Sequence, residues 1–133
     1  MNISSQTKYA TFPQRLFAFN IDFLVFLVTA VLLSFLIKDD YWFWGILFSL
    51  VCVYHAAFES SGWQATFGKK YANILVVNEL GRRLTFFQAL LRIITKYLSL
   101  LLFFGGFFMI YFRKDRRGLH DVLVKTYVVN RSN

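Results

Sequence analysis

The chain has 133 residues, of which 57% are hydrophobic and 20% aromatic, and its 15 Lys and Arg residues outnumber its 7 Asp and Glu residues. Soluble domains have about 45–50% apolar and about 25% charged residues, so a chain with 17% charged residues has more apolar surface than an aqueous fold can cover. The length allows one domain, and a single Cys excludes a disulfide scaffold, a Cys-rich zinc site and a dithiol redox centre.

Three apolar stretches are long enough to matter in a bilayer, whose hydrocarbon core takes about 20 residues of helix. The first covers residues 16–37, the second covers 41–59, and the third belongs to a helix over 90–112. The short link between the first two predicts an antiparallel transmembrane helical hairpin. The sequence therefore predicts an all-α integral membrane protein with this hairpin and a third hydrophobic helical segment.

Basic residues indicate the side of the membrane on which each connection lies. Lys8 and Arg15 precede the first stretch and several Lys and Arg residues follow the second, whereas the short turn has Lys38 beside two Asp residues. Cytoplasmic loops carry an excess of Lys and Arg, so we expect the amino terminus and residues 60–92 to be cytoplasmic. The long apolar run after a polar lead argues against a cleaved signal peptide.

The third segment leaves two topologies open. A full crossing would export the basic tail, residues 113–133, against the charge rule. Alternatively, the segment enters the membrane, turns at Gly105 and Gly106, and returns, which requires that the turn be buried in protein. The second topology keeps the tail cytoplasmic.

The connecting region, residues 60–89, contains strand-like segments. Residues 71–77 and 82–86 flank Asn78 to Gly81, which suits a tight turn, so a small cytoplasmic β-hairpin is predicted between the second and third helical segments. Tail residues 125–130 have the same β-branched character and would add a third strand. Residues 88–94 predict the beginning of the third helix.

Ionisable residues inside the spans form a predicted charged layer near the cytoplasmic leaflet. An Asp or Lys at a helix centre costs about 2.5–3.5 kcal/mol, so each requires a partner or a purpose. Arg15 and Asp22 are seven residues apart and share one face of the first helix. Since the helices are antiparallel, Asp22 is expected near the level of His55. The layer is completed by Glu59, Arg92 and Lys96.

Three interpretations of this layer remain open. It is a structural ion-pair network that fixes helix packing, or a proton or cation site in which Asp22 binds the ion and His55 passes protons. The third interpretation is a site for anionic lipid headgroups, because basic residues face the inner leaflet. Those basic residues are Lys69, Lys70, Arg92 and Lys96.

Enzyme motifs do not fit this chain. The stretch Gly62 to Lys70 resembles a nucleotide-binding loop, but five residues separate its glycines where four are needed. His55 and Glu59 do not form a zinc-binding helix, and Cys52 lies among apolar neighbours. We expect no enzymatic activity, no catalytic residue, no metal, no cofactor and no nucleic-acid partner.

Four motifs occur in an order that resembles the RDD family of small bacterial membrane proteins. The opening run Arg15 to Asp22 is similar to the start of its first helix, and Ser61 to Lys70 resembles its stretch after the second helix. Arg92 matches the basic residue that opens its last hydrophobic segment. Arg117 to Asp121, followed by Thr126 to Val129, resembles its ending, so the resemblance covers nearly all of a single domain, residues 1–133.

The resemblance implies a multi-pass protein of the bacterial inner membrane and a role in transport, most concretely monovalent cation/proton antiport. It implies that Arg15, Asp22 and Asp121 are its main functional residues. A second group of residues forms the cytoplasmic motif, for which turn geometry and interfacial anchoring are the alternative explanation. These residues are Gly62, Thr66, Gly68, Lys69 and His120.

We therefore expect a small transporter, or a subunit of one, that forms a homo-oligomer because three helices can hardly enclose a path. In this hypothesis Asp22 binds the proton or cation, Arg15 and Arg92 are its electrostatic partners, and His55 with Glu59 forms a cytoplasmic relay. The alternative hypothesis is a non-catalytic membrane scaffold or accessory protein that binds anionic lipid or a protein partner.

Overall fold

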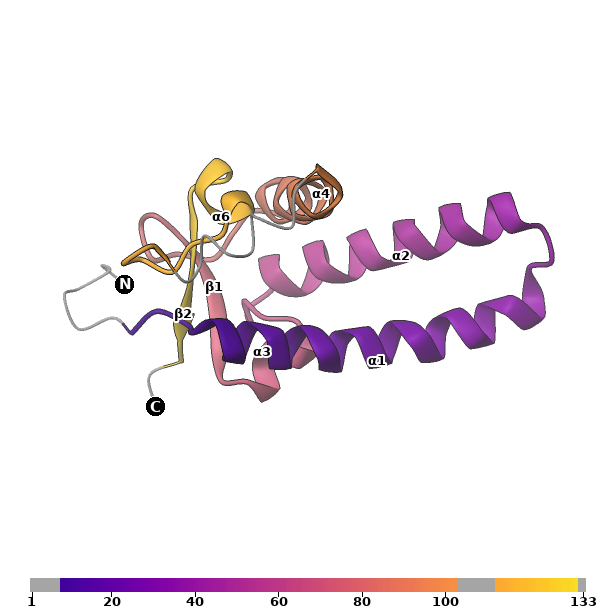
Figure 1. Cartoon of the computed structure of the whole chain (residues 1–133), viewed down its shortest axis with the longest axis horizontal. Helices are drawn as coiled ribbons and strands as arrows, with labels where there is room; N and C mark the ends of the chain where they lie inside the picture. Colours follow the sequence, from indigo (N-terminus) through magenta and orange to yellow (C-terminus); the bar gives the residue numbers. More distant parts are fainter. Residues whose placement is uncertain (1–7, 103–111, 132–133) are drawn as a thin grey trace.

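Two long helices form a hairpin that projects from a small head of short helices and strands (Figure 1). The computed structural model describes residues 8–102 and 112–131. Helix α1 covers Phe12–Leu36 and helix α2 covers Asp40–Ser60. Both helices are long and apolar enough to cross a membrane, in agreement with the two predicted spans.

Side-chain caps set where the two long helices begin. The hydroxyl of Thr11 accepts a hydrogen bond from the backbone N–H of Gln14, and the Gln14 side chain accepts one from the N–H of Thr11. This reciprocal cap stabilises the first turn, so α1 begins at Phe12 rather than at Leu16. Asp39 caps α2 with its side chain alone, which accepts bonds from the N–H groups of Tyr41 and Trp42.

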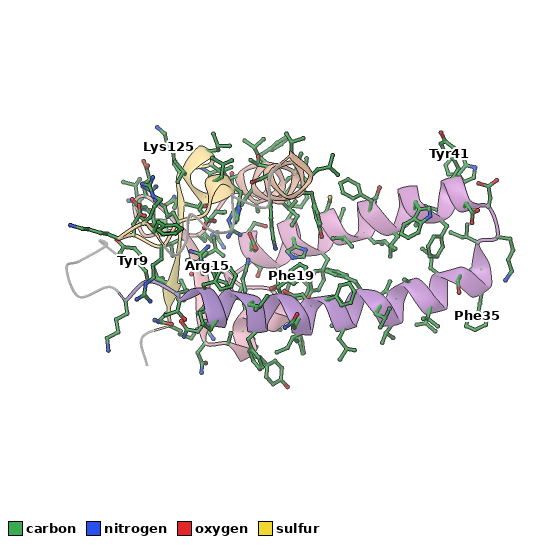
Figure 2. All side chains as sticks on the ribbon, viewed as in Figure 1. Tyr9, Arg15, Phe19, Phe35, Tyr41 and Lys125 are labelled. Carbon is green, nitrogen blue, oxygen red and sulfur yellow. The ribbon has the colours of Figure 1, made fainter. Side chains whose placement is uncertain are left out.

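The surface of the hairpin is apolar. Within α1 only Ala18 and Asp22 are buried, while most of its Phe, Leu and Val side chains are exposed. Figure 2 shows Phe35 and Tyr41 at the far end of the hairpin, with Tyr9, Arg15 and Lys125 at or near the head. An apolar surface of this extent is not stable in water and matches the hydrocarbon of a bilayer.

The head contains a two-stranded antiparallel sheet. Strand β1, Ile74–Asn78, pairs with strand β2, Thr126–Asn130, so that Val76 lies opposite Val128. Tyr9 forms a further bridge to Val129. The amino-terminal segment, the connecting region and the tail therefore lie together at one end of the hairpin (Figure 1).

The predicted β-hairpin between 71–77 and 82–86 is wrong, although its first strand and the tail strand both exist. The turn forms as expected, because the Asn78 side chain accepts bonds from the N–H groups of Leu80 and Arg82. The chain then enters a helix, since Thr85 and Gln88 make a reciprocal cap. This cap ends the second predicted strand, and β2 takes its place beside β1.

Helix α4, Phe86–Leu102, is seen end-on in Figure 1, so it crosses the hairpin rather than running alongside it. It begins at Phe86 rather than at residue 90. Up to Leu102 this helix does not form a third span parallel to the first two. The predicted turn at Gly105 and Gly106 lies outside the described residues.

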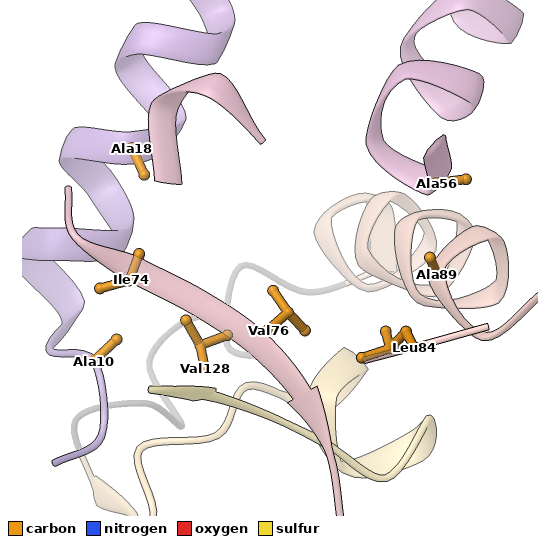
Figure 3. Close-up of a cluster of buried hydrophobic side chains, with 8 residues drawn as sticks. All are labelled: Ala10, Ala18, Ala56, Ile74, Val76, Leu84, Ala89 and Val128. Atoms are coloured by element: carbon orange, nitrogen blue, oxygen red, sulfur yellow. The ribbon is translucent and has the colours of Figure 1, made fainter. Parts of the chain in front are cut away.

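Small side chains allow the head to pack tightly against the base of the hairpin. Two short helices complete the head: α3, Phe67–Tyr71, and α6, Leu119–Leu123. Figure 3 shows the buried apolar cluster that joins both long helices, α4 and the sheet. Its members are Ala10, Ala18, Ala56, Ile74, Val76, Leu84, Ala89 and Val128.

Candidate functional site

A buried layer of charged side chains lies where the hairpin meets the head. Its three carboxylates come from three elements: Asp22 from α1, Glu59 from the last turn of α2, and Asp121 from α6. All three side chains are almost completely buried. Four basic residues accompany them, namely Arg15, Lys69, Arg92 and Lys96.

Glu59 is bound by two cations. The guanidinium Nη1 of Arg92 donates to Glu59 Oε2 at 2.6 Å, and the ammonium of Lys69 forms an ion pair with Glu59 Oε1. Burial lowers the pKa of Lys69, and the Glu59 carboxylate opposes this shift. The end of α2 is thus joined to both α3 and α4.

Asp121 is also bound by two cations. Nε and Nη2 of Arg92 donate to Asp121 Oδ1 at 2.9 and 2.8 Å, and Arg15 forms an ion pair with Oδ2. The N–H of Gly118 donates to the same Oδ2 at 3.2 Å. Burial alone would raise the pKa of Asp121, but mainly Arg15, with His120 and Arg92, outweighs burial and holds this pKa well below its usual range.

Arg15 does not pair with Asp22, which corrects the sequence-based expectation. Its guanidinium binds Asp121 and the carbonyl oxygen of Arg116, the latter at 2.7 Å. Side chains on a helix lean toward its amino terminus, so Arg15 extends toward the head and away from Asp22, which lies two turns deeper. Arg92 likewise contacts Glu59 and Asp121 instead of Asp22.

Asp22 has only neutral hydrogen-bond donors among the described residues. The hydroxyl of Thr66 donates to Oδ2 at 2.6 Å, and Oδ1 accepts from the Tyr54 hydroxyl at 3.1 Å and from the Gly68 N–H at 2.9 Å. Gly68 can approach because it has no side chain: a Cβ at this position would overlap the carbonyl oxygen of Ala18. Asp22 therefore attaches α1 to the start of α3.

His55 and Lys96 lie beside these carboxylates without forming ion pairs to them in the described part of the chain. The Nδ1 atom of His55 is 3.1 Å from the carbonyl oxygen of Val51, and its ring packs against Tyr54 at 5.5 Å. The ammonium of Lys96 is 4.9 Å from the ring centre of Phe19.

The cytoplasmic motif predicted from the sequence divides into two parts. Thr66, Gly68 and Lys69 all take part in the charged layer. Gly62 is exposed in a turn, and a Cβ there would meet nothing. His120 is buried, with Nε2 3.4 Å from Asp121 Oδ1, and burial lowers its pKa to about 3.

Sequence reasoning missed Tyr54. Its hydroxyl both donates to Asp22 and accepts from the N–H of Phe67. The sequence contains an indication of this role, because Tyr54 directly precedes His55 and so lies at the depth expected for Asp22. Within residues 8–102 and 112–131, no three His, Cys, Asp or Glu side chains lie close enough to hold a metal ion.

The fold and the buried layer define a small membrane protein whose apolar hairpin is joined to a polar head by ionic contacts. Comparison with known proteins agrees: the model of the RDD family matches residues 9–125. The chain belongs to the RDD family, as its motifs predicted, and the match includes Arg15, Asp22 and Asp121.

One relative is described in Bacillus subtilis (strain 168), where it is named "Uncharacterized protein YxaI". It is 38% identical to this chain over 84 residues, which are 63% of this chain and 55% of that protein. The chain thus spans about half the length of the curated relative that it matches. No solved structure shows significant similarity.

Proposed function

We propose that this RDD protein is a transporter, or a subunit of one, that exchanges a monovalent cation for protons at Asp22. One observation carries the proposal. Glu59 and Asp121 are each bound by two basic side chains, whereas the described contacts of Asp22 are all to neutral groups. Asp22 is thus the carboxylate of this layer whose charge is not already balanced by a fixed partner.

Neutral partners suit a group that gains and loses a positive ion. A carboxylate held between two cations stays ionised, because protonation would leave both cations buried without a partner. A hydroxyl both donates and accepts, so Tyr54 and Thr66 can reverse their hydrogen bonds when Asp22 takes up a proton or a cation. No ion pair has to break for this exchange.

The other charged residues take different roles from those first expected. Arg15 binds Asp121, and Arg92 binds both Asp121 and Glu59. These ion pairs fix the helices around the site. Glu59 is fully engaged by Lys69 and Arg92, so the proposed proton path does not include it. His55 remains the candidate relay, because its ring contacts Tyr54, which bonds to Asp22.

The charge distribution supports an orientation with the head in the cytoplasm of a bacterial cell, beneath the inner membrane. Eight basic residues are exposed in the described part of the head, against one exposed acidic residue, Glu79. The eight are Lys8, Lys70, Arg82, Arg83, Lys114, Arg116, Lys125 and Arg131. Basic residues favour the cytoplasmic side, and two spans cannot enclose a path alone, so the proposal includes a homo-oligomer.

Ion flux in proteoliposomes tests the role of Asp22. We expect that Asp22→Asn abolishes pH-dependent cation flux while the protein still folds, because Asn keeps the shape of the side chain and cannot carry the proton. Glu79→Gln, which removes an exposed carboxylate, is the matched control and should keep wild-type flux. Unchanged flux in folded Asp22→Asn protein would rule out the assignment.

The basic head supports a second candidate function, a scaffold or accessory protein that binds anionic lipid headgroups or an acidic protein partner. Its test cannot use Lys69, because that residue is buried against Glu59. We expect charge reversal at Arg82 and Arg83, both exposed, to abolish co-purification of a stoichiometric lipid or protein without lowering stability. This candidate also predicts that the wild-type protein shows no cation flux.

A further inference from the structure

The outward face of α4 is an apolar stripe. Phe86 is exposed at the start of the helix, and five further exposed large side chains recur at spacings of four and three residues, which places these five on one side of the helix. They are Phe87, Leu91, Ile94, Leu98 and Leu101. The stripe is well exposed, since Phe87 is 81% and Leu101 is 87% accessible.

The polar face of α4 points inward. Arg92 and Ser99 are buried on this side together with Ala89 and Ile93, and Arg92 holds Glu59 and Asp121. The helix is thus amphipathic in the sense opposite to that of a soluble surface helix, which buries its apolar face. Such an arrangement is stable only where the surroundings of the outward face are apolar.

The position of α4 relative to the hairpin indicates what surrounds its outward face. It crosses the part of the hairpin nearest the head (Figure 1), and its side chains contact both long helices. Tyr97 packs against Phe48 of α2 at 5.8 Å, and Lys96 lies over Phe19 of α1 at 4.9 Å. The helix therefore lies against the exposed apolar surface of the hairpin, to which Phe19 and Phe48 both belong.

We propose that α4 lies in the plane of the bilayer, with its apolar stripe in the acyl chains just below the headgroups of the leaflet on the side of the head. Amphipathic helices of membrane proteins bind in this way, buried about 5–10 Å into the headgroup boundary. Arg82 and Arg83, exposed just before α4, lie where anionic headgroups would meet them.

Lipid fits the stripe better than a second copy of the chain. Helices that associate inside a membrane have small residues at the interface, because lipid is as apolar as a Leu side chain and provides no hydrophobic drive for association. The stripe has only large residues: Phe, Leu and Ile. A cover of acyl chains accounts for its composition, whereas a helix–helix contact does not.

Spin-label accessibility tests this inference in the full-length protein. Cys52 is replaced by Ala, and single Cys variants are made at Phe87, Leu91, Ile94, Leu98 and Leu101. The protein is placed in vesicles of phosphatidylethanolamine and phosphatidylglycerol, and the collisions of each label with oxygen and with a water-soluble nickel chelate are measured. Val28→Cys in α1 and Arg131→Cys in the tail, both at exposed positions, give the acyl-chain and aqueous references.

We expect all five labels to collide with oxygen more often than the Arg131 reference does, and to report one shallow depth along the whole stripe. A depth that increases steadily from Phe87 to Leu101 would overturn the inference in favour of a helix that penetrates the bilayer. Exclusion of both reagents would overturn it in favour of a contact with a second copy. The result does not depend on whether Asp22 carries ions.

Discussion

Asp121 shows how much of the head depends on single side chains. It accepts hydrogen bonds from Arg92 and Gly118 and forms an ion pair with Arg15, so it connects α1, α4 and α6. Each of these contacts is buried, and a buried ion pair that loses one partner costs far more than a surface pair. The layer is therefore the most sensitive part of the head to substitution.

Replacing Asp121 by Asn should lower the free energy of unfolding by about 3–5 kcal/mol, because Arg15 and Arg92 would remain buried without their carboxylate. Asp115→Asn is the matched control. Asp115 pairs with Arg113 and Arg117 near the surface, so its loss should cost about 1 kcal/mol or less. Equal melting temperatures of the two variants in detergent would contradict this ranking.

Gly68 permits the contact between α1 and α3. Gly68→Ala should destabilise the protein by about 1–3 kcal/mol, because the added Cβ overlaps backbone atoms of Ala18 that cannot move aside easily. Gly62→Ala is the control, since a Cβ there meets nothing. Thermal unfolding in detergent measures both, and a Gly68→Ala protein as stable as Gly62→Ala would show that the contact is looser than described.

The burial of His120 makes stability depend on pH. Its pKa is lowered from 6.5 to about 3 in the folded state, so the unfolded chain binds more protons between these values. The free energy of unfolding should therefore fall as the pH is lowered from about 6.5 toward 3 and should be independent of His120 above this window. In His120→Asn, melting temperature should fall less steeply with decreasing pH, and an unchanged slope would refute this role.

Elements that depend on hydropathy can be predicted from the sequence, whereas the contacts between segments that are distant in the sequence cannot. The two spans follow from apolar length alone, and the tail strand follows from its β-branched residues. Proximity in the sequence favours residues 82–86 as the partner of β1. In the structure Thr85 caps α4, so the chain enters a helix at that point and residues 82–86 do not form a strand. The burial of Asp22 was expected, but its neutral partners depend on α3, whose position no local pattern reveals.

The cap of α4 is open to a direct test. Thr85→Ala should lower stability by about 1 kcal/mol, because the N–H of Gln88 loses the hydroxyl that accepts its hydrogen bond. Thr85→Ser keeps that acceptor and should remain near wild type. The measurement is thermal unfolding in detergent, and a Ser variant as unstable as the Ala variant would show that the cap is not the cause.

In the whole molecule, the pairing of β1 with β2 determines that the tail and the connecting region lie at the same end of the hairpin. It places the tail beside the connecting region, at the end of the hairpin opposite Asp39 and Asp40. A membrane crossed by α1 and α2 would then have all of the described head on one side. The excess of exposed Lys and Arg in the head is the reason for the cytoplasmic orientation proposed above.

Site-specific labelling of intact cells measures on which side of the membrane the head and the tip of the hairpin lie. In a Cys52→Ala background, single Cys residues are placed at Asp40 in the tip, Lys70 in the connecting region and Arg131 in the tail, and a membrane-impermeant maleimide is added. With the head in the cytoplasm, only position 40 should be labelled in intact cells, and positions 70 and 131 should be labelled after the cells are opened. Labelling of position 131 in intact cells, with position 70 protected, would contradict this prediction.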